Sequence, residues 1–211
     1  MQTLRECTCD ISVIVPVYNL ERFLLPLLTT LINQDLGDYK AEYIFVLNNC
    51  TDDSEGMIRV SGLPGQILQC TQQGCGPARN VGFDAASGRY IWFMDGDDWL
   101  LSDTAIKQVL DKAYAEDANI LWIPFASENY KYNYFSMVWQ YLLRRDFVAE
   151  FRFPAIQPAE DDAYMRQVLR KAGRNEQNYW TLPRVDRPLY FYNYMREGSN
   201  MYRCLVKHEQ I

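Results

Sequence analysis

The carboxylates at positions 95–98 are the side chains of this sequence best placed to do chemistry. Asp95, Asp97 and Asp98 follow directly on an apolar and aromatic run at 90–94. Such a run predicts a buried strand, and in open α/β sheets ligands bind beyond the carboxyl ends of the strands. Crowded carboxylates repel one another unless a cation lies between them, and hard divalent ions prefer oxygen ligands. We therefore predict a metal site at Asp95 and Asp97; an acidic turn that merely ends a strand is the alternative.

Length and charge narrow the class of protein. A chain of 211 residues with 48% apolar and 23% charged residues has an ordinary globular composition and is long enough to bury a core. Its length suggests between one and two domains, closer to one. The formal net charge of -6 argues against a nucleic-acid partner, because phosphate binding relies on lysine and arginine.

The sequence shows neither a membrane span nor a secretion signal. It contains no apolar run of about 18 residues, so we expect no transmembrane segment. Residues 1–10 carry Arg5, Glu6 and Asp10 and lack the apolar core of a signal peptide. The six cysteines form no C-x-x-C pair, and His208 is the single histidine. These features favour free thiols in a reducing compartment over a disulfide framework.

Strand-like and helix-like segments alternate along the chain. Continuous apolar runs predict strands at 11–17, 43–47, 66–70, 90–94 and 120–123. Helical spacing predicts helices at 21–34 with a kink at Pro26, at 76–88 with Gly88 as the stop, at 106–113, and after 160–162 up to Gly173. The order predicts a layered α/β fold whose sheet is mostly parallel in its first half. The Tyr- and Phe-rich segment 126–153 breaks the alternation, and we interpret it as an excursion from the sheet that covers the site.

Five short motifs, in order along the chain, resemble those of family 2 glycosyltransferases with the GT-A fold. They occupy residues 11–19, 48–54, 76–82, 95–98 and 160–162. Each motif alone is weak, but five at family-like spacing over residues 12–199 are a strong signal. Residues 139–147 and the tail with 188–192, Arg196 and Ser199 also resemble segments of bacterial, non-processive members.

The resemblance implies an inverting glycosyltransferase that moves a sugar from a nucleotide-diphosphate donor, with a UDP-sugar favoured, to an acceptor hydroxyl. It implies an α/β GT-A fold with a mostly parallel central sheet flanked by helices, in a single domain over 1–211. Residues about 10–100 would bind the donor and about 101–211 the acceptor, a saccharide or lipid-linked saccharide. The implied setting is surface polysaccharide or glycolipid assembly by a cytoplasmic protein, with peripheral association at the inner face of a membrane as an option.

The resemblance also assigns residues to the nucleotide sugar. These are Pro16, Val17, Tyr18, Asn48, Arg79, Asp95, Gly96 and Asp97. Mg²⁺ or Mn²⁺ on Asp97, with Asp95 bound directly or through water, would neutralise the leaving diphosphate. Arg79, in the first turn of its helix, could reach the phosphates there, because a helix N-terminus already favours anions. A surface salt bridge is the alternative for Arg79.

Asn48 departs from the family pattern. A gapless match places Leu47 and Asn48 where two acidic residues usually stand, so Asn48 takes the position that contacts the base. An amide oxygen can still accept from uracil, but the amide adds two donors that a carboxylate lacks. Uridine remains the leading base, and a plain turn is the alternative role for the asparagine.

By resemblance, Asp161 is the general base that takes the proton from the acceptor hydroxyl, with Glu160 and Asp162 as the other candidates. Carboxylates at a helix start are also expected for capping and dipole reasons alone. Several aromatic residues could stack on an acceptor sugar or belong to the core. These are Trp99, Tyr130, Tyr132, Tyr134 and Trp139. Arg196 and Ser199 match the tail motif and would close over the diphosphate.

Three other functions remain open. A nucleotidyltransferase would share the sheet but needs a glycine-rich, basic loop after the first strand, where this chain has the sequence of residues 16–20. A sugar-nucleotide-binding protein without catalysis is the non-enzyme alternative. A processive synthase is disfavoured by the lack of a Q-x-x-R-W motif and of a membrane segment. The chain ends at Ile211 and is short for the family, as expected of a truncated chain or of a minimal enzyme that needs a partner for its acceptor.

Overall fold

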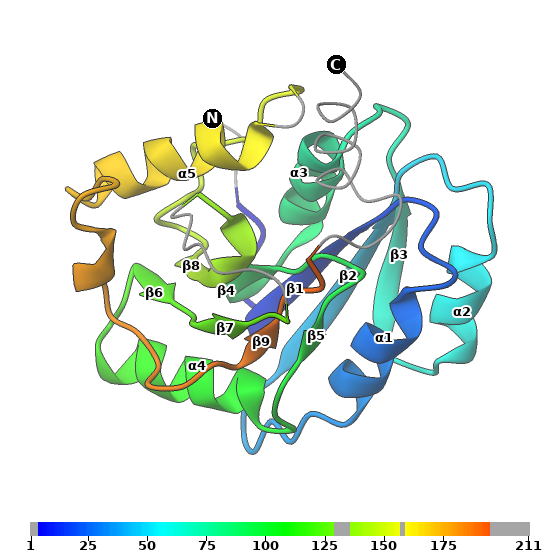
Figure 1. The fold of residues 1–211 in the computed structure, drawn as a ribbon, viewed down its shortest axis with the longest axis horizontal. Coiled ribbons are helices and arrows are strands. Elements are labelled where there is room, and N and C mark those ends of the chain that lie inside the picture. The colour runs from blue at the N-terminus through cyan, green and yellow to red at the C-terminus, as the bar shows by residue number, and fades with distance from the viewer. Residues whose placement is uncertain (1–3, 129–135, 157–158, 195–211) are drawn as a thin grey trace.

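A six-stranded sheet forms the centre of the computed structural model, which describes residues 4–128, 136–156 and 159–194 (Figure 1). Its strands, in spatial order, are β3 (Gly65–Gln69), β2 (Ala41–Leu47), β1 (Cys9–Val17), β4 (Gly88–Phe93), β8 (Tyr141–Arg144) and β6 (Ile120–Trp122). β3, β2, β1 and β4 run parallel, whereas β8 is antiparallel to both of its neighbours. The predicted α/β fold with a mostly parallel sheet is confirmed.

Helices cover both faces of this sheet (Figure 1). They are α1 (Leu24–Ile32), α2 (Ser54–Val60), α3 (Cys75–Ala85), α4 (Ala105–Ala115) and α5 (Glu160–Lys171), with short 3-10 turns η1 (Val138–Gln140) and η2 (Tyr179–Thr181). Side chains of a strand alternate between its two faces. In β1, Val13 and Val15 pack with α1, α2 and α4, whereas Ile14 packs with α3 and α5. Coverage of both faces explains the continuous apolar runs of β1, β2 and β4, whereas the edge strand β3 is partly exposed and less apolar.

A second, three-stranded sheet lies beside the first and has the order β5–β9–β7. Its strands are β5 (Trp99–Leu100), β9 (Tyr190–Phe191) and β7 (Phe125–Ala126). β5 begins directly after the acidic motif, so β9 brings the C-terminal part of the described chain next to that motif. The ring of Trp99 stacks on that of Phe191, with centroids 4.1 Å apart.

Segment 126–153 differs from its interpretation as an excursion. Its residues Tyr141–Arg144 form β8, which pairs with β4 and β6 inside the main sheet. Tyr141, Leu142 and Leu143 are buried, as a central strand requires. A four-residue strand is too short to show periodicity, so composition alone did not identify it.

Three features of the helices also differ from the sequence analysis. Pro26 lies inside the first turn of α1, where a missing N–H costs little, so the expected kink has no cause. Helix α2 was not predicted, since only Ser54 and Ile58 of its seven residues are buried. Helix α3 ends at Ala85, and Gly88 opens β4 instead of stopping the helix. In the described part of the chain, no helix is long and apolar enough to cross a bilayer.

Gly88 predicts a measurable packing constraint. A Cβ at this position would lie 2.6 Å from the backbone carbon of Ile11, because β4 approaches β1 closely there. We expect Gly88→Ala to lower the free energy of unfolding by about 1–3 kcal/mol through overpacking, as measured by urea denaturation. Gly62→Ala is the comparison, since a Cβ there meets nothing within 4 Å and only the φ of +72° is strained. A smaller loss for Gly88 than for Gly62 would contradict the packing argument.

Candidate active site

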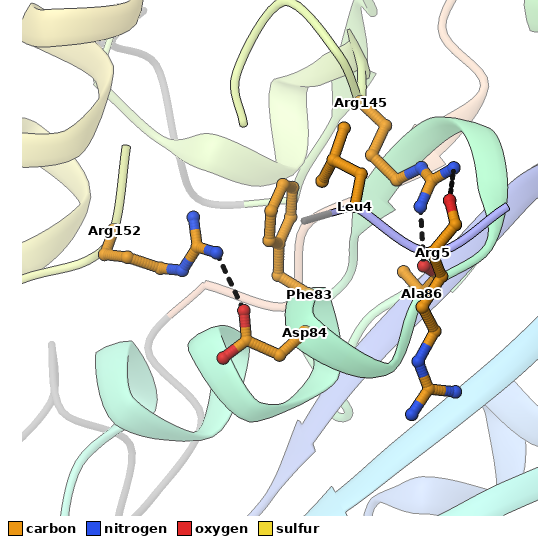
Figure 2. Close-up of a pocket in the computed structure, with 7 residues that line it drawn as sticks. All are labelled: Leu4, Arg5, Phe83, Asp84, Ala86, Arg145 and Arg152. Atoms are coloured by element: carbon orange, nitrogen blue, oxygen red, sulfur yellow. Dashed lines mark hydrogen bonds and ion pairs between the residues drawn. The ribbon is translucent and has the colours of Figure 1, made fainter. Parts of the chain in front are cut away.

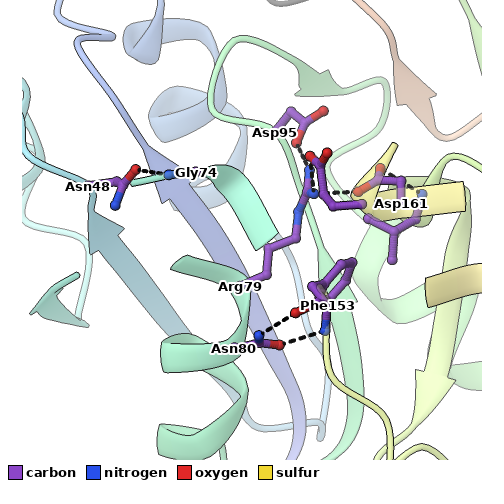
Figure 3. A network of polar contacts seen from close by, with 9 residues as sticks. Asn48, Gly74, Arg79, Asn80, Asp95, Phe153 and Asp161 are labelled. Atoms are coloured by element: carbon purple, nitrogen blue, oxygen red, sulfur yellow. Dashed lines mark hydrogen bonds and ion pairs between the residues drawn. The ribbon is translucent and has the colours of Figure 1, made fainter. Parts of the chain in front are cut away.

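The carboxyl edge of the sheet gathers side chains from three separate segments (Figure 3). Asp95 follows β4, Arg79 belongs to α3, and Glu160 and Asp161 begin α5. Sequence analysis had assigned all four to the donor site or to catalysis. The structure brings them together around the guanidinium of Arg79.

Arg79 is a buried cation shared by three carboxylates. Its side chain is 3% exposed, and Nη2 donates to Asp95 Oδ1 at 2.8 Å. Nη1 donates to Asp161 Oδ1 and, at 3.5 Å, to Glu160 Oε1. Both terminal nitrogens of Arg79 thus donate to carboxylates, and its expected contact with the phosphates stays a prediction. Its burial excludes the alternative of a surface salt bridge.

Asn80 explains why α5 lies where Arg79 can reach it. The Asn80 amide accepts from Phe153 N at 2.9 Å and donates to Phe153 O at 2.8 Å (Figure 3). This pair of bonds fastens the chain before α5 to α3, and the Phe153 ring lies 5.4 Å from the Arg79 guanidinium carbon. Sequence reasoning did not assign Asn80 a role, although it lies inside the motif at 76–82.

The pKa of Asp161 is raised toward neutral pH. Burial raises the pKa of Asp161 to about 7, against the opposing attraction of Arg79. Its second oxygen accepts from Val138 N at 3.3 Å, so η1 helps to orient the carboxyl. A pKa near the working pH is the condition under which a carboxylate best accepts a proton during a reaction.

The neighbours of Asp161 are less suited to that role. Asp162 Oδ2 accepts from Arg166 Nε at 2.7 Å on the outer side of α5, a pair that the helix can form without any site. Glu160 is 6% exposed, and within the described residues its Oε2 has no hydrogen-bond partner. Glu160 thus adds negative charge beside Asp161, whereas Asp162 belongs to the surface.

Hydrogen bonds from β9 and the residues after it hold the acidic loop, residues 95–98, in place. Asp98, 1% exposed, accepts from Tyr190 Oη at 2.6 Å and from Asn193 N at 2.8 Å. Tyr190 Oη also accepts from Asp95 N at 3.1 Å, and Asn193 Nδ2 donates to Asp97 O at 3.2 Å. Burial raises the pKa of Asp98 well above its usual range. Asp98 is therefore structural, and sequence reasoning missed the supporting roles of Tyr190, within the tail segment 188–192, and of Asn193, directly after it.

Asp95 and Asp97 are the partly exposed carboxylates of this loop and the residues that could hold a cation. Across the described ranges, no three histidine, cysteine, aspartate or glutamate side chains are grouped as a ready-made metal site. Mg²⁺ is commonly held by one or two carboxylates together with substrate phosphates and water. The donor set therefore fits an ion that shares its coordination with a diphosphate, and does not form a metal cage of its own.

Most of the remaining residues expected to contact the nucleotide sugar lie at the ends of β1 and β2. Pro16 and Val17 are buried within β1, so of the residues at 16–18 only Tyr18, 44% exposed, presents its side chain to solvent. Gly96 is buried. Asn48 is 4% exposed, and its amide bonds to the backbone of residues 70, 72 and 74.

Most of the aromatic and tail candidates are either core or outside the described residues. Trp139 is 2% exposed and stacks on Tyr190 with centroids 4.8 Å apart, which makes it core and leaves no face for an acceptor. Trp99 is partly exposed but is stacked on Phe191. Five candidates lie outside the described residues: Tyr130, Tyr132, Tyr134, Arg196 and Ser199.

A small pocket at the opposite end of α3 is structural (Figure 2). Arg145 donates there to Ala86 O at 2.9 Å and to Arg5 O at 2.8 Å. Arg152 Nη2 pairs with Asp84 at 2.8 Å. These guanidinium groups tie the end of α3 to neighbouring segments, and the pocket is separate from the carboxyl edge that carries Asp161.

Comparison with known proteins defines the class. Residues 12–181 match the model of the family "Glycosyl transferase family 2", and the chain belongs to this family. EpsJ of Bacillus subtilis, an uncharacterized glycosyltransferase, is 29% identical over 230 residues, covering 90% of this chain and 62% of EpsJ. The minor teichoic acid biosynthesis protein GgaB of the same organism is 35% identical over 121 residues, covering 54% of this chain and 13% of GgaB. The chain thus spans less than two thirds of either relative.

Solved structures confirm the GT-A type fold. TarS 1–349 of Staphylococcus aureus in complex with UDP-GlcNAc superposes with a TM-score of 0.79 at 23% identity, covering 92% of this chain and 60% of that one. Glucosyl-3-phosphoglycerate synthase of Mycobacterium tuberculosis, solved with Mn²⁺, UDP and product, gives a TM-score of 0.67 at 14% identity, covering 96% of this chain and 79% of that one.

The Arg79 network predicts a pH-dependent stability loss. Arg79→Met leaves three carboxylates without their cation, and breaking a buried ion pair typically costs about 3–5 kcal/mol. Loss of the Arg79 attraction raises the folded-state pKa of Asp161 further, so the folded variant binds more protons than the unfolded chain and regains stability as the pH falls. Urea denaturation at about pH 8 and about pH 5 should show the larger loss at about pH 8.

Arg59→Met is the matched control for this experiment. Arg59 pairs with Glu55 at 2.6 Å on the surface of α2, with side chains 64% and 40% exposed. Such pairs contribute about 0–1 kcal/mol. A loss for Arg79→Met no greater than that for Arg59→Met would show that the buried network does not hold the site together.

Proposed function

We propose that this protein is an inverting glycosyltransferase that transfers a sugar from a UDP-sugar to an acceptor hydroxyl. The observation that carries the proposal is the position of Asp161, a carboxyl with a pKa of about 7 joined through Arg79 to Asp95. Arg79 thus holds the candidate base and the first carboxylate of the 95–98 motif close to one another, as a site that joins acceptor and donor needs. UDP-GlcNAc bound to TarS and UDP bound to the mycobacterial synthase support uridine as the base.

In this mechanism Asp161 accepts the proton of the acceptor hydroxyl while the acceptor oxygen bonds to the anomeric carbon. The bond from that carbon to the diphosphate oxygen breaks with its electron pair, and UDP leaves from the opposite face. One displacement inverts the anomeric configuration. Asp95 and Asp97 would hold Mg²⁺ or Mn²⁺, which neutralises charge on the leaving diphosphate when bound.

The proposal extends to the organisation and setting of the chain. Residues about 10–100 form the donor half of a single domain, and residues about 101–211 the acceptor half. The acceptor is a saccharide or lipid-linked saccharide, and the process is the assembly of a surface polysaccharide or glycolipid. The protein acts at the cytoplasmic side of a membrane. The names of GgaB and TarS, which concern teichoic acid and poly(ribitol-phosphate), support a cell-surface polymer.

Asp161 predicts both a pH profile and a mutant phenotype. Only the deprotonated carboxylate can accept a proton, so kcat/KM should rise with pH up to about 7 and level off above it. Asp161→Asn should lower turnover by about 10²–10⁴-fold while leaving UDP affinity nearly unchanged. Asp162→Asn, on the surface of the same helix turn, is the control and should retain turnover.

Calorimetric UDP affinity and thermal stability are measured for both variants alongside turnover. Full turnover by Asp161→Asn would remove the base from this position, and Glu160→Gln then tests the remaining buried candidate. Wild-type protein that binds UDP-sugars but never transfers to a verified acceptor would instead favour a binding protein without catalysis.

The acidic loop predicts metal-dependent donor binding. If Asp95 and Asp97 hold the cation beneath the diphosphate, UDP should bind at least about tenfold more tightly with Mn²⁺, and Asp97→Ala should abolish the difference. Asp103→Ala, at an exposed position after the same loop, should keep the metal effect. Equal UDP affinity with and without Mn²⁺ in wild-type protein would exclude this metal role.

A further inference from the structure

Both N–H donors and the oxygen of the Asn48 amide form hydrogen bonds to one backbone segment. Nδ2 donates to Cys70 O at 3.0 Å and to Gln72 O at 2.7 Å, and Oδ1 accepts from Gly74 N at 2.8 Å. With two N–H donors and one bonded oxygen, a side chain that is 4% exposed has no donor left for a ligand. Figure 3 shows Asn48 directed at Gly74, away from the Arg79 network.

The segment that Asn48 holds connects β3 to α3. Residues 71–73 are exposed, and Gly74, with a φ of +122°, precedes the first residue of α3 in a backbone conformation that favours glycine. Cys70 N donates to Leu47 O at 2.8 Å, so the start of the segment is also tied to the end of β2. The position of this segment therefore determines where α3 begins and where its residue Arg79 lies.

We propose that Asn48 is a positioning residue that latches segment 70–74 to the end of β2, and that it shapes the nucleotide pocket without contacting the base. This inference rests on the proposed function for its nucleotide, but the latch itself is a property of the unliganded chain. Base preference then depends on the shape of the latched segment and does not come from donors or acceptors of Asn48.

The chemistry of aspartate at this position separates the two roles. A carboxylate can accept from Gly74 N but cannot donate to Cys70 O and Gln72 O, and it places negative charge against both carbonyls. If Asn48 holds residues 70–74 in place, Asn48→Asp should release that segment. If Asn48 instead contacts the base, the same change should supply the acceptor that the uracil N–H prefers. At low pH the protonated carboxyl can again donate one hydrogen bond, which closes the latch in part.

Calorimetric titration of UDP and CDP provides the first readout, with Asn48→Asp, Asn48→Ala and the control Asn49→Asp. Asn49 is exposed and makes one bond to the same segment, from Nδ2 to Thr71 O at 3.2 Å. The latch predicts that Asn48→Asp weakens UDP and CDP alike by about tenfold or more at neutral pH, with the UDP to CDP ratio unchanged. Relative to wild-type protein at the same pH, its UDP affinity should recover as the pH falls to about 5.

Hydrogen exchange of the Gly74 amide provides the second readout and needs no nucleotide. The latch predicts slow exchange in wild-type protein and in Asn49→Asp, and faster exchange in both Asn48 variants. Tighter UDP binding and a larger UDP to CDP ratio in Asn48→Asp, with Gly74 still protected, would overturn the inference. Failure of wild-type protein to bind any nucleoside diphosphate would defeat the proposed function, while Gly74 exchange would still decide the latch.

Discussion

One buried guanidinium sets the geometry of this site. Arg79 lies 3% exposed among three carboxylates, and removing charges from water is costly unless each is paired. The cost is offset only if α3, the loop after β4 and the start of α5 all converge on the same point. The other contacts of the site, including the Asn80 bonds to Phe153, hold those segments in that arrangement.

The two sheets position different parts of the site around Arg79. The parallel strands deliver Asp95 to the carboxyl edge, as topology requires of an open α/β sheet. The small second sheet supports the acidic loop from below, because Tyr190 bridges Asp95 N and Asp98. With Asp98 committed to this support, Asp95 and Asp97 are left partly exposed for a ligand. The shared cation also links Asp95 electrostatically to Asp161, so the pKa of Asp161 depends on both Arg79 and Asp95.

Apolar runs and short motifs in the sequence predicted the central strands and the acidic loop, because these features depend on residues close together along the chain. The central parallel strands β1, β2 and β4 are buried on both faces and show continuous apolar runs in the sequence, and the acidic motif after β4 predicted the position of the candidate site. β8 and α2 were missed because four and seven residues carry too little periodicity. The orientations of the Arg79 and Asn48 side chains could not be predicted from the sequence, because each depends on partners distant along the chain. The partner is Asp161 for the arginine and residues 70–74 for the asparagine.

A double-mutant cycle between Arg79 and Asp161 tests the central claim most directly. The free energy of unfolding is measured for wild-type protein, Arg79→Met, Asp161→Asn and the double variant at about pH 8. If the guanidinium holds Asp161 as its partner, Asp161→Asn should be far less costly, or even stabilising, once Arg79 is gone, with a coupling energy above about 1 kcal/mol. Additive losses within about 0.5 kcal/mol would show that the two residues do not interact and would contradict the account.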